Sequence, residues 1–138
     1  MQYKTWNGAS AIVIKDNNVL MVRTKNSTSW SVPSGEVENG ETTEETCLRE
    51  ILEETGYVAR IIKELHTKKT IIQDYKVTTQ YYLCEITGGE ILYHDPDEDI
   101  EEISWKNRSE ISTLLHTYPE DKEIIEQLLD TINTWHVI

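Results

Sequence analysis

The hydrophobic pattern predicts β-strands on both sides of one central helix. In residues 9–24, aliphatic and β-branched side chains flank Asp16-Asn17-Asn18, and this pattern is typical of a β-hairpin. Residues 57–73 read as extended chain, and residues 75–87 alternate polar and apolar positions until a pair of glycines. Together with the segment EISWK at 102–106, they predict three further strands.

The central helix is predicted over residues 43–55. Thr42 or Thr43 can cap its start, because a threonine hydroxyl accepts a hydrogen bond from an otherwise unpaired backbone N–H. Gly56 follows at the position where helices commonly end, since glycine adopts the left-handed conformation without strain.

Two more helices are predicted in the last third of the chain. Residues 108–116 suggest a short helix, and a longer one follows from Pro119, a residue that suits a first helical turn. Its apolar positions recur at helical spacing: Ile124, Ile125, Leu128, Leu129 and Ile132. The order of strands, helix, strands and helices predicts an α/β sandwich built on a mixed sheet.

Composition narrows the class of protein. The 138 residues suit one domain over 1–138, and the net charge of −12 argues against binding nucleic acid or an acidic membrane. No secretory signal or membrane-spanning run is visible, so we expect a cytoplasmic protein. We therefore expect Cys47 and Cys84 to be reduced thiols that face the core.

Negative charge is concentrated around the central helix. Residues 35–57 hold eight glutamates and one basic residue, Arg49. Like charges three or four residues apart on a helix repel by roughly 0.2–0.5 kcal/mol per pair, so stability alone does not explain this composition. Glu45 and Glu53 each lie four residues from Arg49, and we expect both to pair with it.

A helical projection sorts the side chains of residues 43–55 into two groups. One group should face the sheet: Leu48, Ile51, Leu52 and Thr55. An adjacent arc carries three carboxylates: Glu50, Glu53 and Glu54. Converging carboxylates raise one another's pKa unless a cation neutralises them, and Mg²⁺ binds oxygen ligands together with substrate phosphates. The arc therefore suggests a Mg²⁺ or Mn²⁺ site, although glutamate-rich helices are more often solvated surfaces.

One motif joins the loop and the central helix: Gly35, Glu41 and the run Arg49-Glu50-Ile51-Leu52-Glu53-Glu54-Thr55-Gly56. These residues match the charged and glycine positions of the pattern GX5EX7REUXEEXGU, the Nudix box, so the chain resembles the Nudix hydrolase family, in its MutT-like branch. The resemblance implies an α/β fold of the Nudix α/β/α sandwich type with a mixed sheet, in a single domain over residues 1–138.

Two positions depart from the family pattern. The last box position, usually a bulky aliphatic residue, is Tyr57, and the usual glycine before Gly35 is Ser34. In relatives the carbonyl of that glycine often binds metal. Serine retains the carbonyl but resists positive φ, so the backbone of this loop could differ.

The resemblance also implies a reaction: hydrolysis of the pyrophosphate bond in a nucleoside diphosphate linked to another group. Mg²⁺, or Mn²⁺ in its place, would bind the phosphates and activate water. Glu50, Glu53 and Glu54 match the family's metal ligands, and Glu41 and Ser34 are further candidates. Glu50 and Glu53 are also candidate catalytic groups, with Arg49 orienting a box glutamate.

The general base is left open by the resemblance. In some relatives a box glutamate serves, and in others an acid from the loop before the last strand. Of the acidic residues between 95 and 102, we select Glu98 as the candidate base or extra metal ligand.

Three residues are candidates for contacting the substrate. Arg23 can anchor a phosphate, because a guanidinium matches phosphate oxygens, or it can form a surface salt bridge instead. Trp30 can stack on a nucleobase or pack in the core. Tyr75 lies sixteen to eighteen residues past the box, where relatives that act on dinucleoside polyphosphates carry a tyrosine.

The same comparison within the family favours nucleoside triphosphates or dinucleoside polyphosphates over ADP-ribose. ADP-ribose-cleaving relatives carry a proline where this chain has Ile72 and Gln73. The partner is then a small nucleotide, and a homodimer is expected only because dimers are common in the family. Two alternatives remain: a regulatory Nudix module that senses nucleotides without cutting them, and an acidic structural module.

Overall fold

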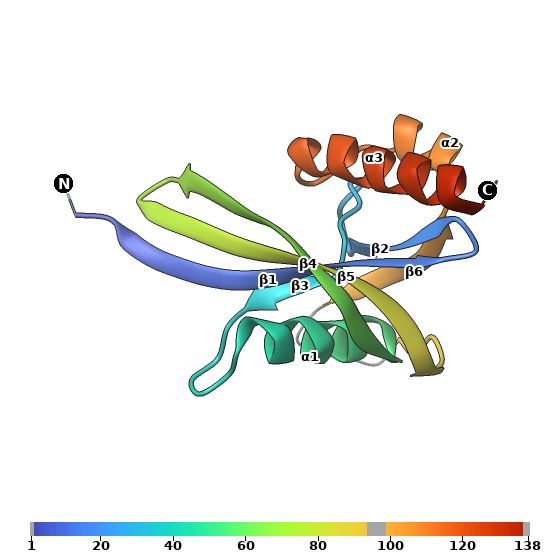
Figure 1. Cartoon of the computed structure of the whole chain (residues 1–138). Coiled ribbons are helices and arrows are strands. Elements are labelled where there is room, and N and C mark those ends of the chain that lie inside the picture. The colour runs from blue at the N-terminus through green and yellow to red at the C-terminus, as the bar shows by residue number, and fades with distance from the viewer. Residues whose placement is uncertain (1, 94–98, 137–138) are drawn as a thin grey trace.

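A mixed β-sheet separates one helix, α1, from two others, α2 and α3 (Figure 1). The structure is a computed structural model, and it describes residues 2–93 and 99–136. The strands are β1 (Lys4–Lys15), β2 (Asn18–Thr24), β3 (Ser34–Glu36), β4 (Tyr57–Ile72), β5 (Tyr75–Gly89) and β6 (Ile100–Lys106). The helices are α1 (Thr43–Thr55), α2 (Arg108–Thr113) and α3 (Pro119–His136).

The sheet has the strand order β4-β5-β1-β2-β6, with β3 paired to β1. β1 runs parallel to β5 and antiparallel to β2 and β3, which confirms the predicted mixed sheet. The β1–β2 turn is formed by Asp16 and Asn17, whose φ angles of 51° and 63° are both left-handed. Asparagine and aspartate tolerate this conformation in tight hairpins, so the predicted turn is confirmed.

The sequence predicted the residues at both ends of α1. Thr42 is the N-cap: its Oγ1 accepts from the Glu45 N–H at 3.1 Å, and Glu45 Oε1 accepts from the Thr42 N–H at 2.9 Å. Gly56 ends the helix with φ 87°. This reciprocal capping satisfies two backbone donors that would otherwise lack partners.

Three boundaries differ from the prediction. β3 lies in a stretch expected to be loop, because a strand of three residues is too short to show a hydrophobic period. β6 begins at Ile100 rather than at 102, so Glu101 is a strand residue rather than a loop acid, and Glu102 pairs in register with Arg23. α2 ends at Thr113 rather than at 116.

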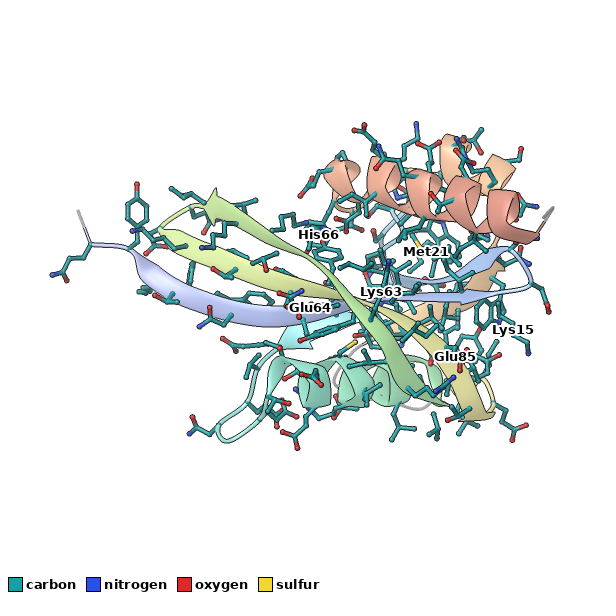
Figure 2. All side chains as sticks on the ribbon, viewed as in Figure 1. Lys15, Met21, Lys63, Glu64, His66 and Glu85 are labelled. Atoms are coloured by element: carbon teal, nitrogen blue, oxygen red, sulfur yellow. The ribbon has the colours of Figure 1, made fainter. Side chains whose placement is uncertain are left out.

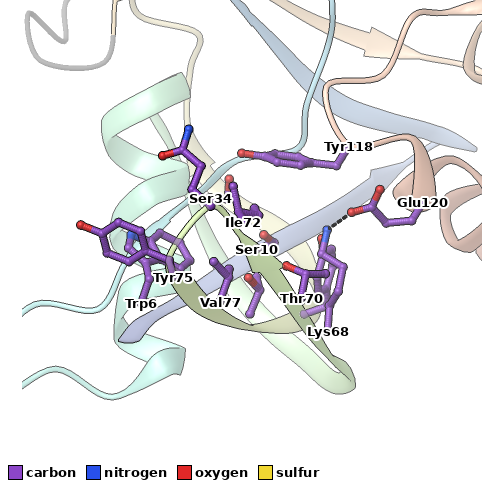
Figure 3. Close-up of a pocket in the computed structure, with 13 residues that line it drawn as sticks. Trp6, Ser10, Ser34, Lys68, Thr70, Ile72, Tyr75, Val77, Tyr118 and Glu120 are labelled. Atoms are coloured by element: carbon purple, nitrogen blue, oxygen red, sulfur yellow. Dashed lines mark hydrogen bonds and ion pairs between the residues drawn. The ribbon is translucent and has the colours of Figure 1, made fainter. Parts of the chain in front are cut away.

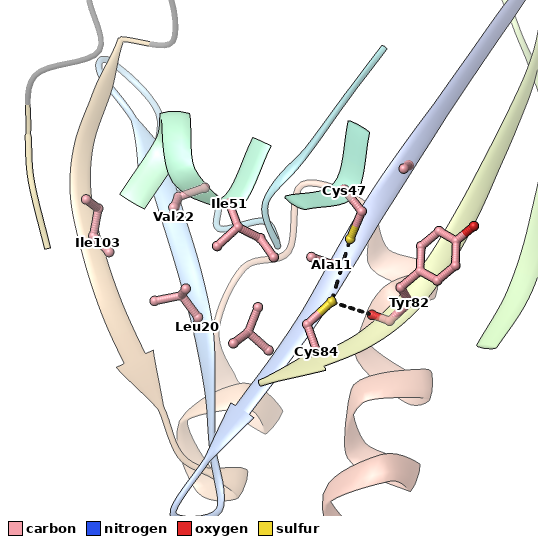
Figure 4. Packing of buried hydrophobic residues seen from close by; sticks show 10 residues of the cluster. Ala11, Leu20, Val22, Cys47, Ile51, Tyr82, Cys84 and Ile103 are labelled. Atoms are coloured by element: carbon pink, nitrogen blue, oxygen red, sulfur yellow. Dashed lines mark hydrogen bonds between the residues drawn. The ribbon is translucent and has the colours of Figure 1, made fainter. Parts of the chain in front are cut away.

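The two faces of the sheet carry separate hydrophobic cores. On the α1 side, Cys47 and Ile51 pack with Cys84 and with side chains from β1, β2 and β6 (Figure 4). The sulfur atoms of Cys47 and Cys84 lie 3.6 Å apart, and both cysteines are buried and free, as expected.

The second core lies under α2 and α3. Ile111, Ile125 and Leu129 pack on Met21, which Figure 2 shows between the strands and α3. Each core is built from alternate positions of the same strands, since successive strand residues point to opposite faces. Among the helices of residues 2–93 and 99–136, none has the length and apolar character that a membrane crossing requires.

Candidate functional site

The buried face of α1 contains two carboxylates. Glu50 and Glu54 are only 4% and 5% exposed, whereas Leu52 is 48% exposed. The expectation that Leu52 faces the sheet is therefore wrong. The carboxylates can be buried because partners meet them there: Glu54 Oε2 accepts from the Ser34 N–H at 3.0 Å, and Glu50 Oε1 accepts from Arg49 at 2.7 Å.

Arg49 is the centre of a charged network on this helix. Its Nε and Nη2 donate to Glu41 at 2.6 and 3.0 Å, and its Nη1 donates to Glu50 at 2.7 Å and Glu53 at 3.1 Å. Nη2 also donates to the Glu36 carbonyl at 3.0 Å, which ties the helix to β3. The expected pair with Glu53 is present.

The expected pair between Arg49 and Glu45 is not found, because the Glu45 side chain is used in the N-terminal capping box. Glu41, nearer to the loop, takes that place. The hydrogen bond from Arg49 lowers the pKa of Glu41 to about 2, and the surrounding carboxylates raise the pKa of Arg49, with Glu41 the strongest. These ion pairs fix the Arg49 guanidinium and the carboxylates that it contacts in position relative to one another.

One buried oxygen in this network has no protein partner. Glu50 Oε2 is shielded from solvent and accepts no hydrogen bond. A buried carboxylate oxygen left in this state costs free energy, so it marks a position suited to a positive ligand. Gly35 makes room for the side chain: a Cβ at position 35 would lie 2.3 Å from Glu50 Cδ and from Oε1.

The three carboxylates do not form a ready-made cluster. In the described part of the chain, no group of three His, Cys, Asp or Glu side chains is arranged to hold a metal ion. Arg49 spans Glu50 and Glu53, while Glu54 turns to Ser34, so the three carboxylates meet different protein partners and their convergence on one cation stays a prediction. The donor set is still all carboxylate oxygen, which is the chemistry that Mg²⁺ and Mn²⁺ prefer.

The two departures from the box are accommodated differently. Ser34 begins β3 opposite Ser10 and is not among the residues with positive φ, so serine causes no strain there. Tyr57 packs edge-on against Trp105, whose Nε1 donates to the Tyr57 hydroxyl at 3.2 Å. Glu98, the candidate base, lies outside the described residues.

A cavity of about 390 Å³ opens beside Ser34 on the sheet face opposite α1. Figure 3 shows Tyr118 along one wall, Trp6 and Tyr75 at one end, and an ion pair between Lys68 and Glu120 at the other. The volume lies within the range of small-molecule sites, roughly 300–1,000 Å³. Ser34 lines the cavity and its N–H also donates to Glu54, so this residue of β3 connects the cavity with the acidic helix on the other face of the sheet.

Only one of the three predicted substrate-binding residues lines this cavity. Tyr75 does. Arg23 instead donates to Glu101, Glu102 and the Ser27 carbonyl, at 3.3, 3.0 and 2.8 Å. Trp30 is 7% exposed in the core under α2 and α3.

Most of the residues that line the cavity were not candidates from the sequence, among them Trp6, Lys68, Tyr118 and Glu120. One signal was available. Lys68, Thr70 and Ile72 occupy alternate positions of β4 and so share a face of the sheet. Tyr118 and Glu120 flank Pro119 at the start of α3, and no pattern in the sequence shows that this helix end meets that strand.

Comparisons with known proteins agree with the box. A family model described as "NUDIX domain" matches residues 4–128. The chain is 39% identical over 88 residues to a "Putative 8-oxo-dGTP diphosphatase" of Bacillus subtilis, covering 62% of this chain and 56% of the relative. It is 33% identical over 95 residues to an "ADP-ribose pyrophosphatase" of Methanocaldococcus jannaschii, covering 65% and 56%.

The fold is also found among solved structures. A structure described as "Crystal structure of UDP-X diphosphatase" matches with a TM-score of 0.76 at 22% identity, over 99% of this chain and 66% of that one. This likeness concerns the fold alone. The chain spans between 28% and 56% of the length of four curated relatives that it matches.

Proposed function

Because the chain belongs to the Nudix family, we propose that it hydrolyses the pyrophosphate bond of a nucleoside diphosphate linked to another group, with the help of a divalent cation. The observation that carries this proposal is Glu50 Oε2, a buried carboxylate oxygen without a hydrogen-bond partner, on a helix that also carries Glu53 and Glu54. Such an oxygen is suited to a hard cation.

Glu50, Glu53 and Glu54 would hold the cation, with Glu41 and the Ser34 carbonyl as further candidates. When bound, Mg²⁺ or Mn²⁺ supplies positive charge that stabilises negative charge developing on phosphate oxygens, and it lowers the pKa of coordinated water. The chain's own contribution is positioning. Arg49 fixes one oxygen of Glu50, Gly35 leaves space for that side chain, and the Ser34 N–H fixes one oxygen of Glu54.

The cavity beside Ser34 is the proposed place for the nucleoside. Its aromatic walls, Trp6, Tyr75 and Tyr118, suit stacking on a base, and its boundary at Ser34 brings a bound phosphate chain toward α1. We propose a nucleoside triphosphate or dinucleoside polyphosphate in preference to ADP-ribose, because Tyr75 lines the cavity. One of the relatives is named as a putative 8-oxo-dGTP diphosphatase, and another is named as an ADP-ribose pyrophosphatase.

The test is a Glu54→Gln variant assayed for phosphate or pyrophosphate release with Mg²⁺ and with Mn²⁺. Glutamine can still accept from the Ser34 N–H, so the fold should persist. Losing a charged group that stabilises the transition state should lower kcat at least about 100-fold. Glu44→Gln, on the exposed side of α1, is the matched control and should retain activity. A Glu54→Gln variant with wild-type turnover would contradict the proposal.

A second candidate is a nucleotide-sensing module that binds without cutting. The observation in its favour is the Arg49 guanidinium that spans Glu50 and Glu53 in place of a ready-made metal cluster. Calorimetric binding of nucleotide with no release of phosphate or pyrophosphate, with either cation, would select this candidate over the hydrolase.

A further inference from the structure

The end of the cavity farthest from Trp6 and Tyr75 holds a hydrogen-bond donor and an acceptor side by side (Figure 3). Lys68 Nζ on β4 lies 2.9 Å from Glu120 Oε1 at the start of α3. The Lys68 side chain is 15% exposed and that of Glu120 is 48% exposed. An ion pair whose acidic partner is this accessible can exchange contacts with a ligand in the cavity.

Buried groups behind the Lys68–Glu120 ion pair hold Lys68 in place. Asp121, which is buried, accepts from Lys68 at 3.2 Å, and its Oδ1 also accepts from the Tyr81 hydroxyl at 2.7 Å. Lys68 is therefore fixed by two strands and a helix. Burial opposes its charge, but the contacts with Tyr81, Glu120 and Asp121 outweigh burial and raise the pKa of Lys68 above its ordinary value. Burial raises the pKa of Glu120, but a hydrogen bond from its own backbone N–H and the contacts with Lys68 together lower it below its ordinary value.

The two groups can still form hydrogen bonds with a ligand. An ammonium has three N–H donors. Within the described residues Glu120 and Asp121 take two of those on Lys68, and the Tyr81 hydroxyl is a third contact, so a ligand acceptor would share or replace one of these contacts. A carboxylate offers about four acceptor positions, of which Lys68 uses one on Glu120. A ligand edge that presents one acceptor next to two donors would match an ammonium that exchanges one contact and a carboxylate that still has acceptor positions.

Tyr118 determines how such a ligand would lie. Tyr118 is 42% exposed and forms a wall of the cavity, and Lys68 Nζ lies over its ring, 4.8 Å from the ring centroid. A flat base stacked on this ring would direct one edge toward the Lys68–Glu120 pair. Its other side would be left for the sugar and the phosphates, on the side of Ser34 and α1.

We propose that Lys68 and Glu120 make the site selective for a guanine base, with Lys68 donating to O6 and Glu120 accepting from N1–H and the 2-amino group. The inference rests on the proposed function, since it places a nucleotide in the cavity. Adenine has a 6-amino donor and an N1 acceptor, so it offers the carboxylate only one donor on this edge. Hypoxanthine retains O6 and N1–H but lacks the 2-amino group.

The test compares kcat/KM for the triphosphates of guanosine, inosine and adenosine. The wild-type protein should prefer guanosine over adenosine by at least about tenfold, with inosine between them, because a site built to hydrogen-bond one base edge leaves its buried polar groups unpaired with another. Glu120→Gln and Lys68→Met should each reduce the guanosine-to-adenosine ratio toward one. A structural defect would lower all three values together and leave the ratio unchanged, which would overturn the assignment.

Matched controls are available on the same elements. Glu123→Gln removes a charge from an exposed position of α3, and Lys69→Met removes one from the opposite face of β4. Both should keep the wild-type ratio. An equal loss of preference in these controls would show that net charge, rather than the pair, sets the selectivity.

Calorimetry with the monophosphates GMP and AMP separates this inference from the proposed function. If no nucleotide is hydrolysed but GMP binds at least about tenfold more tightly than AMP, and Glu120→Gln removes the difference, the hydrolase proposal fails and the guanine site stands. If triphosphates are hydrolysed with no preference among the bases, the hydrolase stands and the guanine site is overturned.

Discussion

At the scale of single residues, burial of the Glu50 side chain depends on the small size of the residue at position 35. Gly35 is part of a strand and has no positive φ, so backbone freedom does not explain a glycine there. The explanation is the space: three atoms of the Glu50 side chain lie within 2.8 Å of where a Cβ would be. The sequence showed Gly35 and Glu50 as parts of one motif, but only the structure shows that the first must be small for the second to be buried.

Gly35→Ala should therefore displace the Glu50 carboxylate from its bond with Arg49. We expect a loss of hydrolytic activity of at least about tenfold, because misplaced catalytic groups lower rates steeply. Circular dichroism should still show the native fold. Gly88→Ala is the control, since a Cβ at position 88 meets no atom within 4 Å and its φ is not positive. Wild-type turnover in Gly35→Ala would refute the importance of this contact.

At the scale of elements, α1 turned out to be rotated relative to the expectation from hydrophobicity. Its buried face carries Glu50 and Glu54 and leaves Leu52 in solvent. A hydrophobic projection assumes that charge is always outside, and it cannot anticipate that β3 and Arg49 supply partners for two carboxylates. The helix ends were easier to predict, because Thr42 and Gly56 act on their own backbone.

The contact between α2 and α3 gives a prediction about pH. Glu126 on α3 accepts from Ser112 at 2.8 Å and from Arg108 at 2.6 Å. The hydrogen bond from Ser112 lowers the pKa of Glu126, burial opposes it, and the charge of Arg108 lowers it further. A carboxyl with a lower pKa in the folded state stabilises the fold above its ordinary pKa of 4.5, and this stabilisation is lost as the pH falls through the folded value.

Glu126→Gln should accordingly be less stable than the wild-type protein at pH 7, and the difference should shrink below pH 4.5 as the native carboxyl is protonated. The effect should be modest and weaker in high salt, because Arg108 is partly exposed. Urea titrations across this pH range measure it, with the exposed Glu123→Gln as control. A difference that stays constant with pH would show that the charge of Glu126 contributes nothing.

At the scale of the whole molecule, one sheet is shared by two cores. The cluster with Ile51 lies under α1, and the cluster with Ile125 lies under α3. Since β1, β2 and β5 contribute alternate side chains to both clusters, neither half can lose its packing without disturbing the other. We expect the protein to unfold as a unit.

Ile51→Ala and Ile125→Ala should each lower the free energy of unfolding by about 2–5 kcal/mol, because both side chains are fully buried. Both variants should show a single denaturant transition. Ile51→Ala should reduce kcat more than Ile125→Ala does when both are folded, since the helix of Ile51 carries the carboxylates, whereas Ile125 packs on the face that holds the proposed nucleoside cavity. Two separate transitions in either variant would contradict the shared sheet as the source of cooperativity.

The sequence by itself determined the family, the α/β class, the helix caps, the hairpin turn and the identity of the acidic residues, because these are properties of local chain segments. The tertiary structure decided which of those acids are buried, that Arg49 pairs with Glu41 rather than Glu45, and that Tyr75 meets Tyr118 and Lys68 around one cavity. Such contacts join residues far apart in the chain. They depend on strand register and helix rotation, which no short segment encodes.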